Sequence, residues 1–285
     1  KNVGTGKTIN ITSSYSGADV SNYSVTDQSS TTANITAKSL TVSGITASDK
    51  IYDGSTSSTL TGTAVYSGLV SGDIFTGSYT GVFANANVGT GKTVNITPSY
   101  SGADVSNYSV TDQSTTTANI TAKALTATAS ASNKTYDGGT TASTTLTFTG
   151  LVGSETLGQT VGSTFDNKNV GSNKTVTVNS ITLADGSGLA ANYSISAGQT
   201  TTANIIAKSL TVSGITASNK TYDGSTNVTL TGTAVYNGLV SGDTFDGTYT
   251  GAFSDKNAGV GKTVTITSSY SGADVSNYSV TDQST

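Results

Sequence analysis

The octapeptide DKIYDGST, residues 49–56, returns with small changes as NKTYDGGT at 133–140 and as NKTYDGST at 219–226. Its centre is a Tyr-Asp-Gly triplet between segments rich in Thr, Val and Leu. An Asp-Gly pair in that setting is a strong hairpin signal, because glycine tolerates the positive φ that tight turns require. We therefore predict that each triplet marks one copy of a β domain, with Asp-Gly in a turn and Tyr in a thin core: Tyr52, Asp53 and Gly54; Tyr136, Asp137 and Gly138; Tyr222, Asp223 and Gly224.

A second marker, Asn-Tyr-Ser, sets the length of the repeat. It begins at Asn22, Asn107, Asn192 and Asn277, so each step is 85 residues. That period is too long for one coil of a β-solenoid and suits a small sandwich domain. The predicted division is 1–36 as the second half of a truncated repeat, 37–121 as a complete repeat, 122–206 as a divergent repeat, and 207–285 as a repeat lacking its last strand.

The pattern of apolar residues predicts an all-β chain. Leu40 and Val42 alternate with Ser and Thr, as do Val94 and Ile96, which is the period of a half-buried strand. We expect about seven strands per repeat and no helix. Because no Pro/Gly-rich spacer separates the repeats, we expect tandem Ig-like β-sandwiches of about 85 residues in an elongated rod.

One strand carries large aromatic residues separated by glycines on the same face. It reads FTGSYTGVF in the first complete repeat and FDGTYTGAF in the last. Glycine lets a ring lie over a neighbouring backbone, so we predict that this strand supplies much of the core. The alternative is a carbohydrate-stacking surface. The residues concerned are Phe75, Tyr79 and Phe83, and Phe245, Tyr249 and Phe253.

Composition excludes several classes of function. The chain has no Cys and no His, so disulfides, thiolate nucleophiles, His bases and nearly all zinc chemistry are ruled out. With a net charge of −4 and Lys as its only cation, the chain is a poor nucleic-acid binder. No GxSxG elbow is present, and we predict that the chain is not an enzyme. It begins at Lys1 and contains no Met or long apolar run, so we expect a segment whose export signal and anchor lie outside it.

Two further patterns suggest ligands and are better explained by turns. The string NVGTGKT at Asn87–Thr93 ends like a phosphate-binding loop, but Ala86 stands where the motif needs its first glycine. Recurrent aspartates next to Gly or Asn are the candidates for calcium, although turn chemistry is the favoured interpretation. We expect no cofactor other than this possible calcium, at Asp53, Asp73, Asp104, Asp223, Asp243 and Asp274.

Several strings in a fixed order resemble a known family. They are NKTYDGST, GLVSGDTF, NVGTGKTVNIT, GADVSNYSV and TTANITAKSLT. Together they resemble the YDG and MBG repeat domains of large bacterial surface adhesins, many of them similar to the filamentous-haemagglutinin family exported by two-partner secretion. The resemblance implies β-sandwich modules strung as a stalk, and it brings no catalytic residues. The middle repeat departs from the pattern at Gly153-Ser154-Glu155 and in the loop before Asn192.

The predicted function is a structural stalk or fibre segment of a secreted adhesin, extracellular or at the cell surface, serving adhesion, aggregation or biofilm matrix. Expected partners are the neighbouring repeats and other copies of the chain, which could complete the truncated ends. The alternative is a carbohydrate-binding module that holds an extracellular polysaccharide on exposed tyrosines such as Tyr66 and Tyr100. No nucleic acid or membrane-spanning segment is expected.

Overall fold

A computed structural model describes all of residues 1–285 and confirms an all-β chain built from tandem domains. The chain divides into two compact units, one made of 1–123 with 191–194 and the other of 124–190 with 195–285. The only helical segments are four short 3-10 turns, η1 (Val20–Asn22), η2 (Val105–Asn107), η3 (Ala190–Asn192) and η4 (Val275–Asn277). Each comes directly before the Tyr of an Asn-Tyr-Ser triplet.

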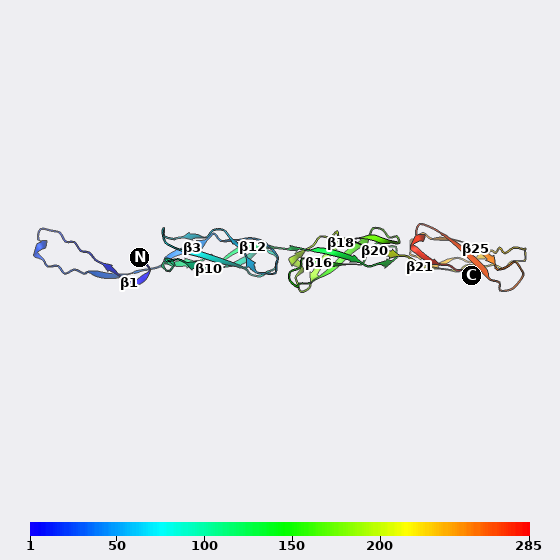
Figure 1. Ribbon diagram of the computed structural model, residues 1–285, viewed down its shortest axis with the longest axis horizontal. Helices are drawn as coiled ribbons and strands as arrows, with labels where there is room; N and C mark the ends of the chain where they lie inside the picture. Colours follow the sequence, from blue (N-terminus) through cyan, green and yellow to red (C-terminus); the bar gives the residue numbers. More distant parts are fainter. The chain divides into compact units, whose positions relative to one another are not determined.

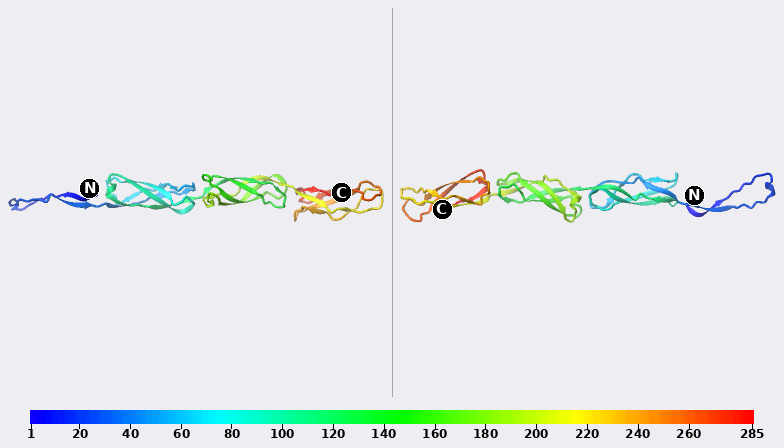
Figure 2. Two further views of the ribbon diagram at one scale, coloured as in Figure 1. Left: turned by 90° about the horizontal axis from the view of Figure 1, so that it is seen from below. Right: turned by 180° about the vertical axis from the view of Figure 1, so that it is seen from behind.

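Residues 1–36 form a single ribbon. Strands β1 (Gly4–Asn10) and β2 (Ser30–Ile35) pair antiparallel, and Thr8 lies opposite Thr32. No second layer covers them, as both views of Figure 2 show. The side chains of β2 are accordingly exposed along its whole length.

The first complete repeat has two sheets and a small strand pair (Figure 1). One sheet has the order β11 (Tyr108–Thr111), β3 (Lys38–Ser43), β8 (Val65–Ser67). The other has the order β5 (Lys50–Ile51), β12 (Thr115–Thr121), β10 (Gly89–Ser101), β9 (Thr76–Phe83), β6 (Ser57–Ser58). The pair is β4 (Thr46–Ala47) with β7 (Leu60–Thr61).

The first and last segments of this repeat run side by side in the same direction. Lys38 lies opposite Tyr108 in the parallel pair β3–β11, and Lys50 lies opposite Ile120 in the parallel pair β5–β12. The offset is 70 residues in both pairs (108 − 38 and 120 − 50). The other strand pairings of this repeat are antiparallel.

Gln113 bridges the gap between these two parallel pairs. Its side-chain oxygen accepts the N–H of Ile45 at 3.0 Å, and its side-chain nitrogen donates to the Ile45 carbonyl at 2.6 Å. The amide thus replaces the backbone hydrogen bonds that are missing where the chain passes from one sheet to the other. Gln283 and Ile215 repeat the arrangement at 2.9 Å and 2.7 Å.

Burial follows the predicted alternation. In β10, Val94 and Ile96 are buried while Thr93, Asn95 and Thr97 face solvent. Threonine suits these outward positions because a β-branched side chain packs well on a pleated surface. The core is therefore a narrow double row of apolar side chains between two Thr-rich surfaces.

The second unit holds the other two repeats. The middle repeat pairs β14 (Thr126–Ala131) with β16 (Thr144–Thr149), and has a sheet of order β15 (Lys134–Thr135), β20 (Thr200–Ile206), β18 (Gly171–Asp185), β17 (Leu157–Phe165). The short strands β13 (Lys123–Ala124) and β19 (Tyr193–Ser194) pair with each other, and β19 belongs to the first unit.

The last repeat contains a sheet of order β24 (Val235–Asn237), β21 (Lys208–Ser213), β27 (Tyr278–Thr281). It also has the pairs β22 (Thr216–Ala217) with β23 (Leu230–Thr231) and β25 (Asp246–Phe253) with β26 (Val264–Ser271). No strand of this repeat corresponds to β12 or β20.

Three sequence predictions need correction. Asp53-Gly54 does not join a hairpin, because β5 pairs with the distant β12 and β6 pairs with β9. Tyr222 is not in the core but 61% exposed, since no strand covers it. The first complete repeat has ten strands, β3 to β12, and not about seven, because turns divide its edges into pieces of two or three residues.

Candidate functional site

Each Tyr-Asp-Gly triplet forms a loop closed by a lysine three residues before the aspartate. Asp53 accepts the N–H of Ser55 at 2.8 Å and the ammonium of Lys50 at 2.7 Å, and Gly54 has a φ of 77°. Lys50 also lies 5.6 Å from the centroid of the Phe83 ring. The hydrogen bond from Lys50 lowers the pKa of the Asp53 carboxyl. The same loop occurs at Lys134 and Asp137, and at Lys220 and Asp223.

In each of these loops, a lysine ammonium occupies the position beside the aspartate that a metal ion would need. Lys50 donates further hydrogen bonds to the carbonyls of Ser55 and Ser57, at 2.8 and 3.1 Å. The Asp53 carboxylate is thereby turned toward its own loop. In the last repeat, the hydrogen bond from Lys220 lowers the pKa of Asp223 to about 2.

The other four candidate aspartates meet in pairs at the end of a repeat, each pair facing a lysine of the preceding repeat. Lys168 lies 3.1 Å from Asp243 and 2.9 Å from Asp274. Lys1 stands in the same way 3.1 Å from Asp73 and 3.4 Å from Asp104. No group of three or more acidic residues that could hold a metal ion is found in residues 1–285. These aspartates are therefore arranged as acceptors for the lysine of a neighbouring repeat.

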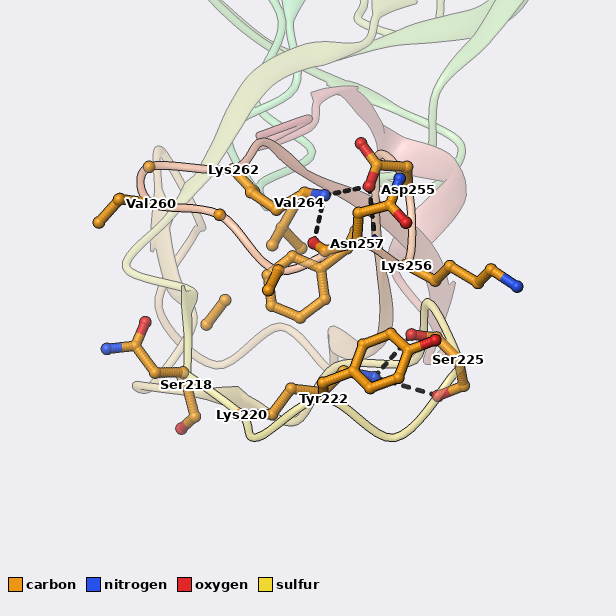
Figure 3. Close-up of a pocket in the computed structure, with 16 residues that line it drawn as sticks. Ser218, Lys220, Tyr222, Ser225, Asp255, Lys256, Asn257, Val260, Lys262 and Val264 are labelled. Carbon is orange, nitrogen blue, oxygen red and sulfur yellow. Dashed lines mark hydrogen bonds and ion pairs between the residues drawn. The ribbon is translucent and has the colours of Figure 1, made fainter.

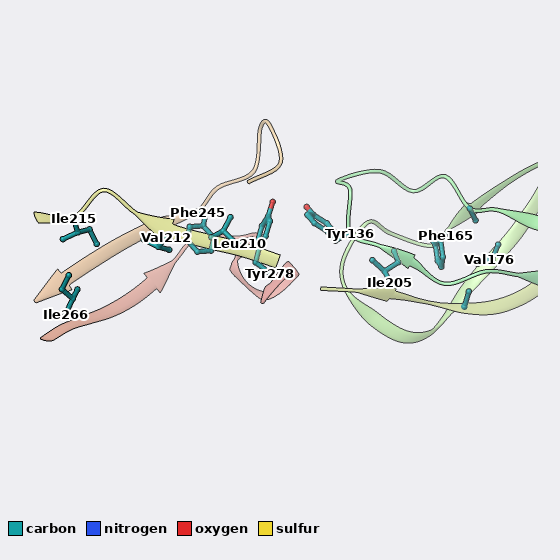
Figure 4. Close-up of a cluster of buried hydrophobic side chains, with 12 residues drawn as sticks. Tyr136, Phe165, Val176, Ile205, Leu210, Val212, Ile215, Phe245, Ile266 and Tyr278 are labelled. Carbon is teal, nitrogen blue, oxygen red and sulfur yellow. The ribbon is translucent and has the colours of Figure 1, made fainter. Parts of the chain in front are cut away.

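A tyrosine pair completes this contact in the second unit. Tyr136 and Tyr278 both donate their hydroxyls to one oxygen of Asp243, at 2.8 and 2.6 Å, and their rings meet edge to face at 5.6 Å. Figure 4 shows the two tyrosines between the core of the middle repeat, with Phe165, and that of the last repeat, with Phe245. The buried side chains of both repeats thus form one continuous cluster.

The electrostatics of this contact favour the charged carboxylate. Burial alone would raise the pKa of Asp243, but the hydrogen bonds from Tyr278, Tyr136 and Lys168 lower it. Burial and the bond to Asp243 raise the pKa of Tyr278 to about 12 and also raise that of Tyr136. The hydrogen bond from Lys168 lowers the pKa of Asp274.

An asparagine makes the most regular contact between repeats. The N–H of Val170, in the loop before β18, donates to the side-chain oxygen of Asn277 at 2.9 Å. Val3 donates to Asn107 and Val88 to Asn192 with the same distance, 2.9 Å. Asn277 is completely buried. We call this set of contacts the junction. It consists of the hydrogen bond from a valine N–H to the asparagine of an Asn-Tyr-Ser triplet and, where they occur, the ion pairs between the lysine and the two aspartates.

The junction between the first complete repeat and the middle repeat lacks the lysine and both aspartates. Glu155 and Leu189 occupy the positions of Asp73 and Asp104, and Ala86 occupies the position of Lys1. The lysine and the two aspartates are thus absent together at this junction. The hydrogen bond from the valine N–H to the asparagine side chain is present in all three junctions.

The aromatic strand is used inside the repeat. Phe75 packs edge to face on Tyr66 and Tyr108, at 5.2 and 5.8 Å between ring centroids. Tyr79 donates to the Tyr66 hydroxyl at 3.2 Å, and that hydroxyl accepts the N–H of Gly77 at 3.0 Å. In the last repeat Phe245 is buried, Tyr249 makes the same bond to Tyr236 at 3.1 Å, and Phe253 is half-buried.

Exposed tyrosines occur only where a repeat is incomplete. Tyr23 and Tyr15 lie in residues 1–36, and Tyr222 lies in the repeat without a final strand. The counterpart of Tyr23 in the first complete repeat, Tyr108, is buried, and its hydroxyl donates to Asp73 at 2.7 Å. A row of tyrosines open to a sugar is therefore not a property of the complete repeat.

Comparison with known proteins identifies the repeats. The sequence matches the YDG domain over residues 36–118, 121–203 and 206–285. The chain belongs to the YDG domain family. No curated protein and no solved structure matches it. The chain has no helix with the length and hydropathy of a membrane span.

Some residues of the junction stand out in the sequence, but the junction itself does not. The sequence marks Asp73, Asp104, Asp243 and Asp274 as calcium candidates. It assigns no role to Lys1, Lys168 or the asparagines. One feature of the sequence indicates a shared role for these polar residues. They recur at the same place in successive YDG repeats, next to loops that otherwise change in length.

Proposed function

We propose that this chain is a load-bearing stalk segment of a bacterial surface adhesin, located outside the cell and held between a distant anchor and a binding region. The observation that carries the proposal is the parallel arrangement of 38–51 beside 108–121. The proposal assigns no catalytic role to the chain.

Parallel first and last segments suit a repeat that is pulled from its two ends. A pulling force acts at the Lys38 end of the first segment and at the Thr121 end of the last. Because the two segments run in the same direction, these forces slide them past each other, and all hydrogen bonds between them are loaded together. An antiparallel hairpin pulled at its open end would instead lose its bonds one at a time. The last repeat has the same geometry, with Lys208 opposite Tyr278.

The junctions supply the second property that a stalk requires. A stalk must transmit force and direction from one domain to the next, and a free linker transmits direction poorly. In the second unit, Lys168, Val170 and Tyr136 of the middle repeat all bind groups of the last repeat. With such contacts, the free energy of unfolding of the array is approximately the sum of the contributions of the single repeats and of the contacts between neighbouring repeats.

Family membership and composition support a place outside the cell. YDG repeats occur in adhesin-like and surface proteins, and the Cys-free chain folds without any need for oxidation. A carbohydrate-binding role is less well supported, because the hydroxyls of Tyr66, Tyr79 and Tyr108 already bind groups of their own repeat.

Single-molecule force spectroscopy tests the proposal. The full chain, tethered through its two ends, should unfold in repeated steps, each lengthening it by about 250 Å, since a repeat of 80-odd residues extends to about 3.4 Å per residue less its folded length. The matched control applies force through handles at Thr76 and Ser101, which are paired at the open end of the antiparallel hairpin β9–β10.

The two pulling directions should differ clearly in rupture force. We expect end-to-end pulling to need at least twice the force of pulling through Thr76 and Ser101, because the first loads many bonds at once. Equal rupture forces in the two directions, or gradual extension without repeated steps, would contradict a load-bearing role.

A further inference from the structure

Tyrosines of neighbouring repeats meet in pairs at two junctions. Tyr136 of the middle repeat and Tyr278 of the last repeat pack edge to face, with 5.6 Å between ring centroids and 78° between ring planes. Tyr52 of the first complete repeat and Tyr193 of the middle repeat meet in the same way, at 5.4 Å and 79°. Both distances are those of rings in contact, and all four side chains are buried. Each pair therefore holds a phenol of one repeat against a phenol of the next.

The hydroxyl ends of Tyr136 and Tyr278 converge. Both hydroxyls bind the same carboxylate oxygen of Asp243, and Figure 4 shows the two phenol oxygens next to each other between the two repeats. Two phenols couple through the ring carbons adjacent to their hydroxyls, and the shared acceptor brings these carbons to the same place. The carboxylate is in addition a base that can take the proton that a phenol releases when it loses an electron.

Tyrosine is the side chain of this protein that a one-electron oxidant attacks. The chain has 14 Tyr and no Cys, Met, Trp or His. In most proteins the sulfur of cysteine and methionine is oxidised first. Since that alternative is absent, an electron that is removed from this chain comes from a tyrosine.

A series of rings leads from the surface of the last repeat to the buried pair. Tyr270 is half-buried, and its hydroxyl donates to the Asp282 carboxylate. The Tyr270 ring lies 5.1 Å from that of Phe245, and Phe245 lies 5.7 Å from Tyr278. An oxidant that meets Tyr270 can thus draw an electron from the pair without touching it. In the middle repeat Leu157 occupies the position of Phe245, so this route to Tyr193 is interrupted.

We propose that Tyr136 and Tyr278 form a site of oxidative cross-linking, at which hydrogen peroxide, acting through a haem peroxidase, joins two neighbouring repeats by a dityrosine bond. Each phenol loses one electron to the oxidant together with its O–H proton, and the first proton passes to Asp243. The two radicals then form a C–C bond between the carbons adjacent to their oxygens, and the hydrogens on these carbons move to the phenol oxygens. Overall, two tyrosines and one peroxide give one dityrosine and two water molecules.

The cross-link would be a covalent bond between repeats in a chain that cannot form disulfides. It would close residues 136–278 into one loop, so that a force applied at the ends of the chain could not extend them. An oxidising location outside the cell would favour the reaction. The inference does not rest on the proposed mechanical function, because the bond can form whether or not the chain bears load.

Tyr222 is a natural comparison for Tyr136, since it occupies the same position in the last repeat. It lines a cavity of about 380 Å³ between the Ser218–Ser225 segment and the Asp255–Val264 loop (Figure 3). No other tyrosine lines this cavity, and Tyr222 is 61% exposed. Tyr222 is therefore open to an oxidant but has no second phenol beside it.

Oxidation of the full chain at low concentration with hydrogen peroxide and a haem peroxidase, followed by mass spectrometry, tests the proposal. The single-chain fraction should lose the mass of two hydrogen atoms and gain the fluorescence of dityrosine. After cleavage at lysine, peptides 135–168 and 263–285 should be joined, with fragment masses that place the bond at Tyr136 and Tyr278. Tyr136→Phe and Tyr278→Phe keep the rings and should each lose this product. The matched control Tyr222→Phe should form it like the wild type.

Two further readouts make the test decisive. The yield at Tyr136 and Tyr278 should be several-fold higher than at Tyr52 and Tyr193, and equal yields would overturn this preference. Stretched from its ends, the cross-linked chain should be shorter by about 480 Å, because residues 136–278 at about 3.4 Å each stay inside the closed loop. A single-chain fraction that keeps its mass would overturn the proposal, and so would a joined product that survives Tyr136→Phe. Dityrosine found only within one repeat would do the same.

Discussion

Tyr136 donates its hydroxyl to Asp243 across 107 residues of sequence, from the Tyr-Asp-Gly loop of one YDG repeat to the loop between β24 and β25 of the next, at 2.8 Å. The same tyrosine packs its ring on Tyr278. A residue that marks the repeat in the sequence therefore lies where two repeats meet. This position explains why the triplet combines an aromatic residue with a tight turn.

The buried asparagine of the junction should be its most sensitive side chain. Replacing Asn277 by Ala leaves the Val170 N–H without an acceptor, which should cost about 1–3 kcal/mol of the free energy of unfolding. Asn22→Ala is the matched control, because Asn22 occupies the same place in residues 1–36 and is exposed, so that its change should stay within about 0.5 kcal/mol. Urea unfolding curves measure both. Equal effects of the two changes would show that the junction adds no stability.

The triplet tyrosines should differ in importance although their sequences agree. Tyr52→Ala removes a buried ring and should cost about 3–5 kcal/mol, the range for large aromatic truncations in a core. Tyr222→Ala removes an exposed ring and should change the stability of the unassociated chain by less than about 0.5 kcal/mol. Thermal unfolding at low protein concentration compares them. A large loss for Tyr222→Ala would contradict the exposure described for its ring.

The aromatic strand should not accept a side chain at Gly77. A Cβ there would lie 2.4 Å from the Tyr79 hydroxyl and 2.6 Å from the Tyr66 hydroxyl. Gly77→Ala should therefore destabilise its repeat by about 1–3 kcal/mol through overpacking. Gly139→Ala is the control, since its Cβ would meet nothing closer than 3.4 Å and its φ is not positive. Similar melting temperatures for the two variants would contradict the packing described for Tyr66 and Tyr79.

Stability should fall at both ends of the pH scale, with opposite causes. The pKa of Asp243 is lowered in the folded state, so its contribution is present above about pH 4, the unfolded pKa, and is lost as the pH falls below it. The pKa of Tyr278 is raised from 10.0 to about 12, so its contribution is present below pH 10 and is lost between pH 10 and about 12.

Urea unfolding as a function of pH measures these contributions. A plateau from about pH 4 to pH 10 is expected for the second unit, with a fall on both sides. In a variant with both Asp243→Asn and Tyr278→Phe, the two slopes should become shallower. Unchanged slopes would show that these two groups do not carry the pH dependence.

The sequence predicted what depends on short-range patterns. The alternation of Leu40 and Val42, or of Val94 and Ile96, reflects which face of a strand is buried, and these residues are buried as expected. The spacing of Asn-Tyr-Ser gave the repeat length for the same reason, because each copy folds around its own core.

These short-range patterns do not predict long-range contacts. The Asp53-Gly54 turn does not close a hairpin because its strand pairs with a segment 70 residues further on (120 − 50). Tyr222 has the same neighbours in sequence as Tyr52, yet Tyr222 is exposed, whereas Tyr52, whose N–H donates to the distant Thr121 carbonyl, is buried. The junction requires two repeats at once, so the pattern within one repeat gives no sign of it.

The central claim is that successive repeats are held by directed contacts and not by a free linker. Electron–electron distance measurements between spin labels at Thr147 and Thr267, both exposed and in different repeats of the second unit, test this most directly, and the Cys-free chain allows labelling at those sites alone. A single narrow distance distribution is predicted. It should broaden in Lys168→Met, which removes the ion pairs to Asp243 and Asp274, and stay narrow in the control Lys256→Met. A broad distribution in the wild-type chain, unchanged by Lys168→Met, would contradict the account.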